Sequence, residues 1–145
     1  MKRHLMLAVL CAATMSTAAF ARNDVEAYSL DAAFKSEGSD KVGSDIALVF
    51  AGQKHTAVEK SMGEIATNKK TNGVGRSDEA ACQYVFLSAV LALQERARQL
   101  GGNAVINIKS NYKNKLTESA TEFTCGSGAL MSGVALKGEV VTLKK

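Results

Sequence analysis

The sequence predicts an α+β fold in which a small antiparallel sheet packs on one long helix, as two layers. Apolar residues recur at helical spacing from residue 78 to residue 100. Shorter runs of alternating or continuous apolar residues, typical of strands, lie on both sides of that segment and end at glycines. The 145 residues are too few for two large domains. We therefore expect a signal peptide over residues 1–21, a flexible leader over 22–44 and one domain over 45–145.

The first 21 residues have the pattern of a cleaved secretory signal. Basic residues 2–4 precede the apolar run 5–13, and residues 19–21 (Ala-Phe-Ala) offer small side chains at the two positions that a signal peptidase reads. A transmembrane anchor is the alternative, but the run is shorter than the roughly 20 residues that a bilayer needs. We expect export to the periplasm, a mature chain that begins at Arg22, and no stable membrane insertion after cleavage.

The charge balance argues against a nucleic-acid partner. Residues 1–21 contain two of the 18 Lys and Arg residues and none of the 14 Asp and Glu residues, so the net charge falls from +4 to +2 when they are removed. The pairs Lys69-Lys70 and Lys144-Lys145 are short and lack interleaved aromatic residues, and we interpret them as surface charge.

Two cysteines, Cys82 and Cys125, remain in the predicted mature chain. An even number of cysteines in an exported protein indicates a disulfide. Closing a loop of about 44 residues would stabilise the fold by about 4 kcal/mol. A redox pair or a metal site is the alternative, although the sequence has no CxxC spacing and His55 is the one histidine after residue 21. Whether the bond is purely structural or senses redox state stays open.

The expected elements before the helix are few. Residues 22–44 are polar, with a short apolar stretch around 27–34, and indicate a loosely held leader or a short helix. The continuous apolar run 46–51 predicts a buried strand, and the mixed segment 58–70 predicts a more exposed one.

The helix is predicted over residues 78–100. Ser77 is the N-cap candidate, acidic residues 78–79 oppose the helix dipole, and Gly101 follows the last apolar residue. Its length would be about 34 Å. The apolar surface is wider than one stripe, so we expect cover on two sides, by the sheet and the leader or by the sheet and another subunit. The stripe consists of Cys82, Val85, Phe86, Ala89, Leu93, Ala97 and Leu100, and it is widened by Tyr84, Leu87, Val90 and Leu91.

Alternation of apolar residues predicts strands over 104–109 and 121–125, with a polar segment 110–119 between them. Cys125 should then face the core, where Cys82 in the first turn of the helix can approach it to the Cα separation of about 5.5 Å that a disulfide needs. Apolar residues 134–136 and 140–143 predict further strand, with a bulge or tight turn at Gly133 or Gly138.

A glycine-rich loop, residues 73–77, leads into the helix and is a weak anion-binding pattern. We take Lys70, Gly75 and Arg76 as the candidate anion site. The alternative is a flexible loop before an acidic helix end, because no P-loop sequence occurs and acidic residues 78–79 would repel an anion.

No motif for catalysis, a metal or a cofactor occurs. The segment 126–128 (Gly-Ser-Gly) resembles the end of a hydrolase nucleophile elbow, but we interpret it as a close-packed strand crossing. Glu95 and Arg98 should form an exposed pair on the helix. A hydrolase with carboxylates gathered around His55 is a third alternative, and we expect no enzyme activity.

Two segments resemble known small proteins. Residues 95–108 are similar to the helix-to-strand junction of the YbjQ-like family, A-x-x-x-G-A-[ND]-A-V, with Gly102 where that family has Ala. Residues 123–130 resemble the cysteine-containing final strand of the lipoprotein RcsF, a relative of the same fold. That protein has a lipid anchor and two disulfides, unlike this chain, so its signalling role is not carried over. The YbjQ-like resemblance implies an α+β fold; some members form pentamers or are described as heavy-metal-binding.

A closer resemblance, over residues 46–143, is to small exported bacterial proteins often labelled "excinuclease ATPase subunit". Residues 77–82 and 133–138 carry it. The label does not suit a chain that lacks a P-loop and a four-cysteine zinc set, and we treat it as a misannotation. We expect a periplasmic binding or stress-sensing module, without a cofactor, whose partner is an envelope protein or a small ligand. The alternative is a homo-oligomer that binds a metal or a small ligand between its subunits.

Overall fold

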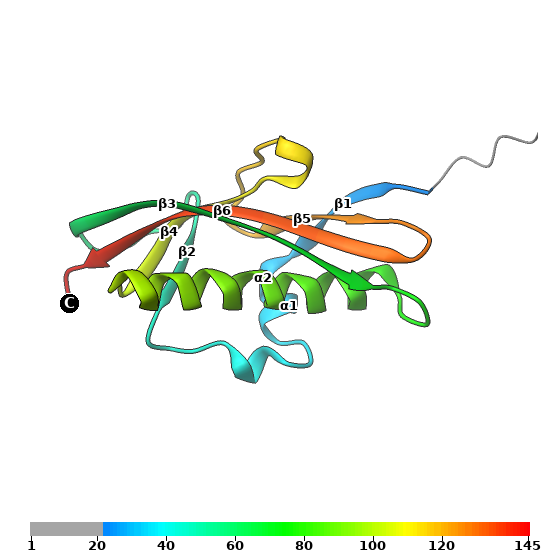
Figure 1. Ribbon diagram of the computed structural model, residues 1–145, viewed down its shortest axis with the longest axis horizontal. Coiled ribbons are helices and arrows are strands. Elements are labelled where there is room, and N and C mark those ends of the chain that lie inside the picture. Colours follow the sequence, from blue (N-terminus) through cyan, green and yellow to red (C-terminus); the bar gives the residue numbers. More distant parts are fainter. Residues whose placement is uncertain (1–21) are drawn as a thin grey trace, which may run out of the picture.

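A curled sheet of six strands covers one side of a long helix (Figure 1). The computed structural model describes residues 22–145, so the predicted signal peptide lies outside the described residues. The predicted α+β class is confirmed. In chain order the elements are β1 (Asp24–Ser29), α1 (Leu30–Phe34), the 3-10 helix η1 (Ser39–Lys41), β2 (Ala47–Phe50), β3 (Val58–Asn72), α2 (Asp78–Leu100), β4 (Ala104–Ser110), the 3-10 helix η2 (Tyr112–Asn114), β5 (Glu122–Ser127) and β6 (Met131–Leu143).

Strand β6 organises the sheet. Its first residues pair with β5 and its later residues with β4, while β3 runs along its other edge for the whole length of β3. The strand order is β1-β5-β6-β4-β2, with β3 beside β6. All pairs are antiparallel except β2 with β4, which corrects the expectation of a wholly antiparallel sheet. The crossover through β3 and α2 is long enough to return the chain in the same direction, as a parallel pair requires.

Helix α2 begins and ends as its sequence predicts. The Ser77 side chain accepts a hydrogen bond from the backbone N–H of Ala80 at 3.1 Å. Gly101 adopts the left-handed conformation, with φ at 80°, and the N–H of Gly102 donates to the carbonyl of Ala97 at 2.9 Å. This pattern is the glycine C-cap that satisfies the last carbonyl groups of a helix.

The core lies between α2 and the sheet. Phe86 of α2 stacks on Phe123 of β5, with 4.2 Å between the ring centroids, and both rings are buried. Most residues of the predicted apolar stripe are buried with them, whereas Leu100 is partly buried. The buried strand residues around this pair include Val105, Ile108, Val134, Leu136 and Val140.

Residues 24–34 form regular structure. Strand β1 corrects the expectation of a flexible leader, and α1 is the short helix that was its alternative. Strand β1 pairs with β5, from Asp24 opposite Ser127 to Ser29 opposite Glu122. Helix α1 then places Leu30 and Ala33 in the core. Because β1 lies at the edge of the sheet and five of its six side chains are exposed, backbone pairing holds it, and so short a segment carries only a weak strand signal of its own.

The second side of α2 is covered by residues 30–46 of the same chain (Figure 1). Phe34 lies edge-on to Phe86, with 5.4 Å between the ring centroids. Leu87 and Val90, which widened the predicted apolar surface, are buried. Of the two covers expected from the sequence, the structure therefore supplies the one within the chain.

Glycines permit a close approach of Tyr112 to the sheet. Gly126 of β5 pairs with Gly133 of β6, and the Tyr112 ring occupies the space that a side chain at Gly126 would need. This agrees with the predicted close-packed crossing at residues 126–128. Strand β6 is continuous through Gly133 and Gly138. The irregularity expected near Gly138 lies in the neighbouring strand β4. There Asn107 has φ at 52°, and the pairing register with β6 shifts between Ile106 and Lys109.

Candidate functional site

The Cys82–Cys125 disulfide ties the start of α2 to the middle of β5. The two Cα atoms are 5.9 Å apart and both residues are fully buried. The predicted pairing is therefore present. Ser127 lies beside it, with its Oγ 3.4 Å from the sulfur of Cys82 and 3.1 Å from Oγ of Ser132. Because thiols in solution cannot reach buried sulfurs in the folded state, the position favours a structural bond over a redox sensor.

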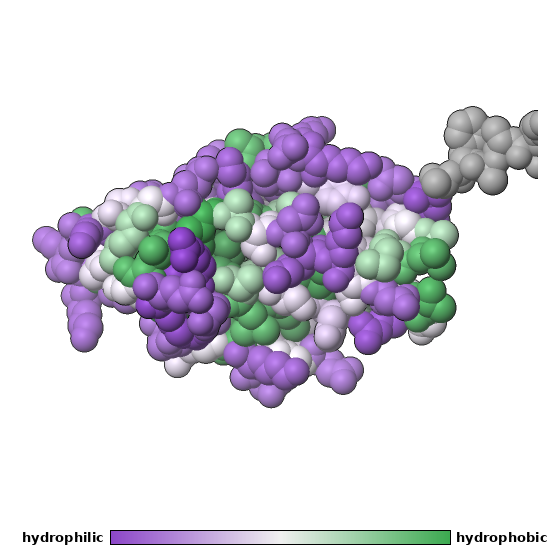
Figure 2. All heavy atoms as spheres, in the orientation of Figure 1, coloured by the Kyte–Doolittle hydropathy of each residue, from purple (hydrophilic) through white to green (hydrophobic). Residues whose placement is uncertain are grey.

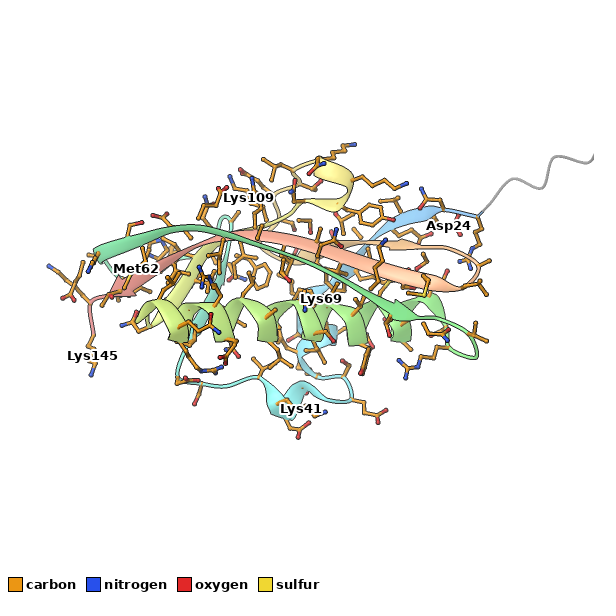
Figure 3. The ribbon with its side chains drawn as sticks, viewed as in Figure 1. Asp24, Lys41, Met62, Lys69, Lys109 and Lys145 are labelled. Carbon is orange, nitrogen blue, oxygen red and sulfur yellow. A yellow bond between two sulfur atoms is a disulfide. The ribbon has the colours of Figure 1, made fainter. Side chains whose placement is uncertain are left out.

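A surface groove runs between the segment around η1 and the first turns of α2. Its volume is about 310 Å³. One wall consists of residues 36–41, and the other consists of α2 and the loop that precedes it. Figure 3 shows Lys41 on the segment below α2. We call this the η1–α2 groove, and it is lined by Ser36, Glu37, Gly38, Lys41, Arg76, Ala80, Gln83 and Tyr84.

The loop before α2 sets the position of Arg76. Asn72 Oδ1 accepts a hydrogen bond from the N–H of Val74 at 2.8 Å, and the N–H of Arg76 donates to the carbonyl of Gly73 at 3.1 Å. Gly75 has φ at 78°, a conformation that glycine adopts without strain. These local hydrogen bonds form a tight turn that brings Arg76 to the rim of the groove.

Arg76 lies over the ring of Tyr84. The central carbon of its guanidinium is 4.8 Å from the ring centroid, which is cation–π geometry. The Tyr84 side chain is half exposed and so remains open to a ligand. With Lys41 on the opposite wall and Glu37 beside it, the groove combines two cations, one carboxylate and an aromatic face.

The predicted anion site is brought together only in part. Gly75 and Arg76 lie in the loop as expected, whereas Lys70 lies in β3 opposite Gly133 and does not line the groove. The second cation of the groove is Lys41, which sequence reasoning missed. No local signal could have found it, because it belongs to the segment interpreted as a leader and meets Arg76 only through the packing of residues 30–46 on α2.

The amino end of α2 is already occupied by protein groups. Ser77 accepts the N–H of Ala80, and Asp78 forms an ion pair with Arg22. The carboxylate of Asp78 therefore takes the place near the positive end of the helix dipole that an anion would favour. Any anion in the groove would be held by side chains, and the helix end would contribute little.

The other residues weighed for chemistry lie apart from the groove. His55 is exposed, and its Nδ1 lies 2.7 Å from the carbonyl oxygen of Thr56. Glu95 pairs with Arg98 at 3.6 Å, as predicted. Within residues 22–145, no three side chains among His, Cys, Asp and Glu are grouped so that they could hold a metal ion. No helix in the same range is long and apolar enough to cross a bilayer.

Asp45 and Arg98 form the best-defined ion pair of the described chain. Arg98 Nε and Nη2 donate to the two carboxylate oxygens of Asp45 at 2.7 and 2.8 Å. These hydrogen bonds lower the pKa of Asp45 from 3.8 to about 2. The pair joins the end of α2 to the segment that covers it, so its role is structural.

The comparisons with known proteins add little. No family model and no curated protein matches the chain. One solved structure, of a Pediococcus pentosaceus protein of unknown function assigned to the DUF74 family, superposes with a TM-score of 0.47 at 14% identity. The superposition covers 67% of this chain and 98% of that one. Similarity at this level carries no argument about function.

Proposed function

We propose that the chain is an exported binding module of the bacterial periplasm, without enzyme activity. Its η1–α2 groove would take a small ligand that combines an anionic group with a flat apolar part. The observation that carries the proposal is the placement of Arg76 over Tyr84 in a groove that also contains Lys41. As part of the same proposal, we infer that the chain is related to the YbjQ-like proteins, whose helix-to-strand junction residues 95–108 resemble.

The chemistry of the groove suits such a ligand. A guanidinium group presents parallel N–H donors that match a carboxylate or a phosphate, and Lys41 adds a second positive charge. Arg76 covers one face of the Tyr84 ring, and the exposed remainder of the side chain would contact the apolar part of the ligand. Glu37 would disfavour ligands with more than one negative charge close to it.

Both walls of the groove are supported from behind, which favours binding with little reorganisation. The α2 wall is joined to β5 by the disulfide at Cys82. The opposite wall, residues 36–41, is followed by a segment that α2 holds in place. Gln94 and Arg98 of α2 form hydrogen bonds with Gly43 and Asp45 of that segment. A disulfide of this kind persists in an oxidising compartment, and the signal-like residues 1–21 support export to one.

The alternative is a homo-oligomer that binds a metal or a small ligand between its subunits. The broad apolar surface of α2 suggested it, and residues 30–46 cover Leu87 and Val90 of that surface, whereas Tyr84 stays 49% exposed. We prefer the groove of a single chain because it gives the ligand a defined place.

Benzoate is a suitable first probe, because it joins a carboxylate to a flat ring. Nitrogen–proton correlation spectra should show shifts confined to the groove, at Gly38, Gln83 and Tyr84, with a dissociation constant on the order of 1 mM. Benzylammonium, which carries the opposite charge, should shift these signals far less. Arg76→Gln should weaken benzoate binding roughly fivefold to tenfold.

Arg96→Gln is the matched control, since Arg96 is an exposed arginine of α2 outside the groove. It should bind benzoate like the wild type. Shifts scattered over the surface, or equal binding by the Arg76 and Arg96 variants, would disprove the proposed site.

A further inference from the structure

The charged side chains that line the η1–α2 groove have no charged partner within the protein. Arg76 and Lys41 provide two cations and Glu37 one carboxylate, and none of the three forms an ion pair with another residue of the range 22–145. At the amino end of α2, in contrast, Arg22 is paired with Asp78. Figure 2 shows hydrophilic residues on the segment around η1, below α2. The groove therefore offers charges of both signs to a ligand.

The carboxylate of the groove and its arginine belong to different walls. Glu37 is part of the wall formed by residues 36–41, whereas Arg76 is part of the wall formed by α2 and the loop before it. The volume of about 310 Å³ is at the lower end of the range for ligand sites, so the groove suits a small ligand such as a single amino-acid residue. A ligand that fills the groove can contact both walls at once.

The hydrogen-bonding groups of the groove define what the ligand must offer. Guanidinium and ammonium groups only donate, so the ligand needs an acceptor such as a carboxylate beside Arg76 and Lys41. An ionised carboxylate only accepts, so the ligand needs an N–H donor beside Glu37. Gln83 can accept as well, because its Nε2 donates to Glu79 at 3.4 Å while its Oε1 has no partner in the described chain. Benzoate meets the first requirement and leaves Glu37 without a donor.

We propose that the groove recognises an aromatic amino-acid unit through its α-carboxylate and its α-nitrogen. The inference rests on the proposed function, because it assigns a ligand to the same groove. The carboxylate would lie against Arg76 and Lys41, and the α-nitrogen would donate to Glu37. The aromatic ring would contact the exposed part of Tyr84. A phosphate monoester is a poorer ligand, since its phosphate carries about two negative charges and offers no donor to Glu37.

Titration of the oxidised wild-type chain with matched ligands, followed in nitrogen–proton correlation spectra, tests the role of the α-nitrogen. N-acetyl-L-phenylalanine contains the ring, the carboxylate and an amide N–H, whereas 3-phenylpropanoate has the same ring and carboxylate but no α-nitrogen. The first ligand should bind roughly fivefold more tightly than the second. N-acetyl-L-phenylalaninamide lacks the carboxylate and should bind at least about tenfold more weakly than N-acetyl-L-phenylalanine.

A free amino acid and the last residue of a peptide present the same groups, and a further ligand distinguishes these two sources. The α-nitrogen is an ammonium group in L-phenylalanine and an amide in N-acetyl-L-phenylalanine, which represents a peptide end. Tighter binding of L-phenylalanine would identify the free amino acid as the ligand. Tighter binding of N-acetyl-L-phenylalanine would identify the carboxyl end of a peptide.

Glu37→Gln tests the carboxylate itself. The change removes the charge that accepts the α-nitrogen and also the repulsion that acts on the ligand carboxylate. It should therefore weaken binding of N-acetyl-L-phenylalanine and slightly strengthen binding of 3-phenylpropanoate, so that the two affinities differ by less than about twofold. Asp40→Asn is the matched control, because it makes the same change of charge at an exposed position of the same segment that does not line the groove. It should keep the roughly fivefold preference.

Two results would overturn this inference and leave the proposed function in place. One is equal binding of N-acetyl-L-phenylalanine and 3-phenylpropanoate to the wild type, with both weakened by Arg76→Gln. The other is an equal response of the preference to Glu37→Gln and Asp40→Asn, which would reduce the role of Glu37 to general surface charge. Groove signals that respond to none of these ligands, nor to benzoate, would overturn the proposed function together with this inference.

Discussion

The side-chain amide of Gln94 forms two hydrogen bonds with the backbone of Gly43. Its Oε1 accepts the N–H of Gly43 at 3.1 Å, and its Nε2 donates to the carbonyl of Gly43 at 2.8 Å. The same Nε2 donates to the carbonyl of Ile46 at 2.9 Å. Gln94 is completely buried and Gly43 is partly exposed, so the hydrogen bond to Ile46 is the one that is fully shielded from water. One glutamine in an apolar helix thereby fastens the segment that follows the opposite wall of the groove, residues 36–41.

Replacing Gln94 tests this attachment. Gln94→Leu would leave the buried carbonyl of Ile46 and the partly buried N–H and carbonyl of Gly43 without these partners, and such losses are costly where water has little access. We expect the free energy of unfolding to fall by about 2–3 kcal/mol. Urea denaturation followed by circular dichroism measures it. Gln99→Leu, on the exposed face of the same helix, should cost less than about 0.5 kcal/mol. Equal costs for the two variants would show that the buried amide does not hold the segment.

The disulfide should make the largest single contribution to stability. Cys82→Ser removes the bond that joins α2 to β5, and the loop it closes predicts a loss of about 4 kcal/mol. Cys125→Ser and the double variant should lose a similar amount, because all three changes break the same link. Chemical denaturation of the three variants beside the oxidised wild type checks this. A loss below about 1 kcal/mol in each would mean that the core holds these elements without the bond.

The long helix and the disulfide could be predicted because their signals are local or nearly unique. Ser77 and Gly101 mark both ends of α2 within a few residues of the helix itself. For the disulfide, only two cysteines follow residue 21, so the sequence allows one pairing. Alternation placed Cys125 on the core side of its strand, which the structure confirms.

Other features could not be predicted because they depend on distant partners. The strand Asp24–Ser29 is short and mostly exposed, and its pairing with β5 makes it a strand. Lys41 and Arg76 share a groove because residues 30–46 fold across α2, and no periodicity reports such a contact. The parallel pairing of β2 with β4 likewise follows from the path of the whole chain.

Acid should weaken the link between Asp45 and Arg98. The pKa of Asp45 is about 2 in the folded chain, below its ordinary value of 3.8. Because the folded pKa is lowered, the pair contributes its full stability above pH 3.8 and loses it as the pH falls through about 2. A carbon-detected NMR titration of the Asp45 carboxyl group measures this directly.

Arg98→Gln should return the pKa of Asp45 towards 3.8, since the two hydrogen bonds from Arg98 are the main cause of the shift. Glu95→Gln changes the other partner of Arg98 and should leave the titration of Asp45 almost unchanged. A wild-type Asp45 that titrates at its ordinary value would refute the bidentate pair.

Tyr112 should make Gly126 intolerant of any side chain. A Cβ atom at Gly126 would overlap the Tyr112 ring, so we expect Gly126→Ala to destabilise the fold by about 1–3 kcal/mol. Adding Tyr112→Ala should recover part of that loss. At Gly73 the nearest atoms are 3.6 Å or more from such a Cβ, and Gly73→Ala should be nearly neutral. Melting curves distinguish the variants, and a neutral Gly126→Ala would contradict the packing.

The central claim is that the chain is an exported, disulfide-bonded binding module. Native mass spectrometry of the chain released from the periplasm tests this claim most directly. The account predicts a chain that begins at Arg22, contains no thiol that iodoacetamide can modify, and carries a small anionic ligand that Arg76→Gln loses and Arg96→Gln keeps. A chain found in the cytoplasm with its leader and two reactive thiols would contradict export. An oxidised periplasmic chain that carries no ligand, or whose ligand is indifferent to Arg76, would contradict the binding function.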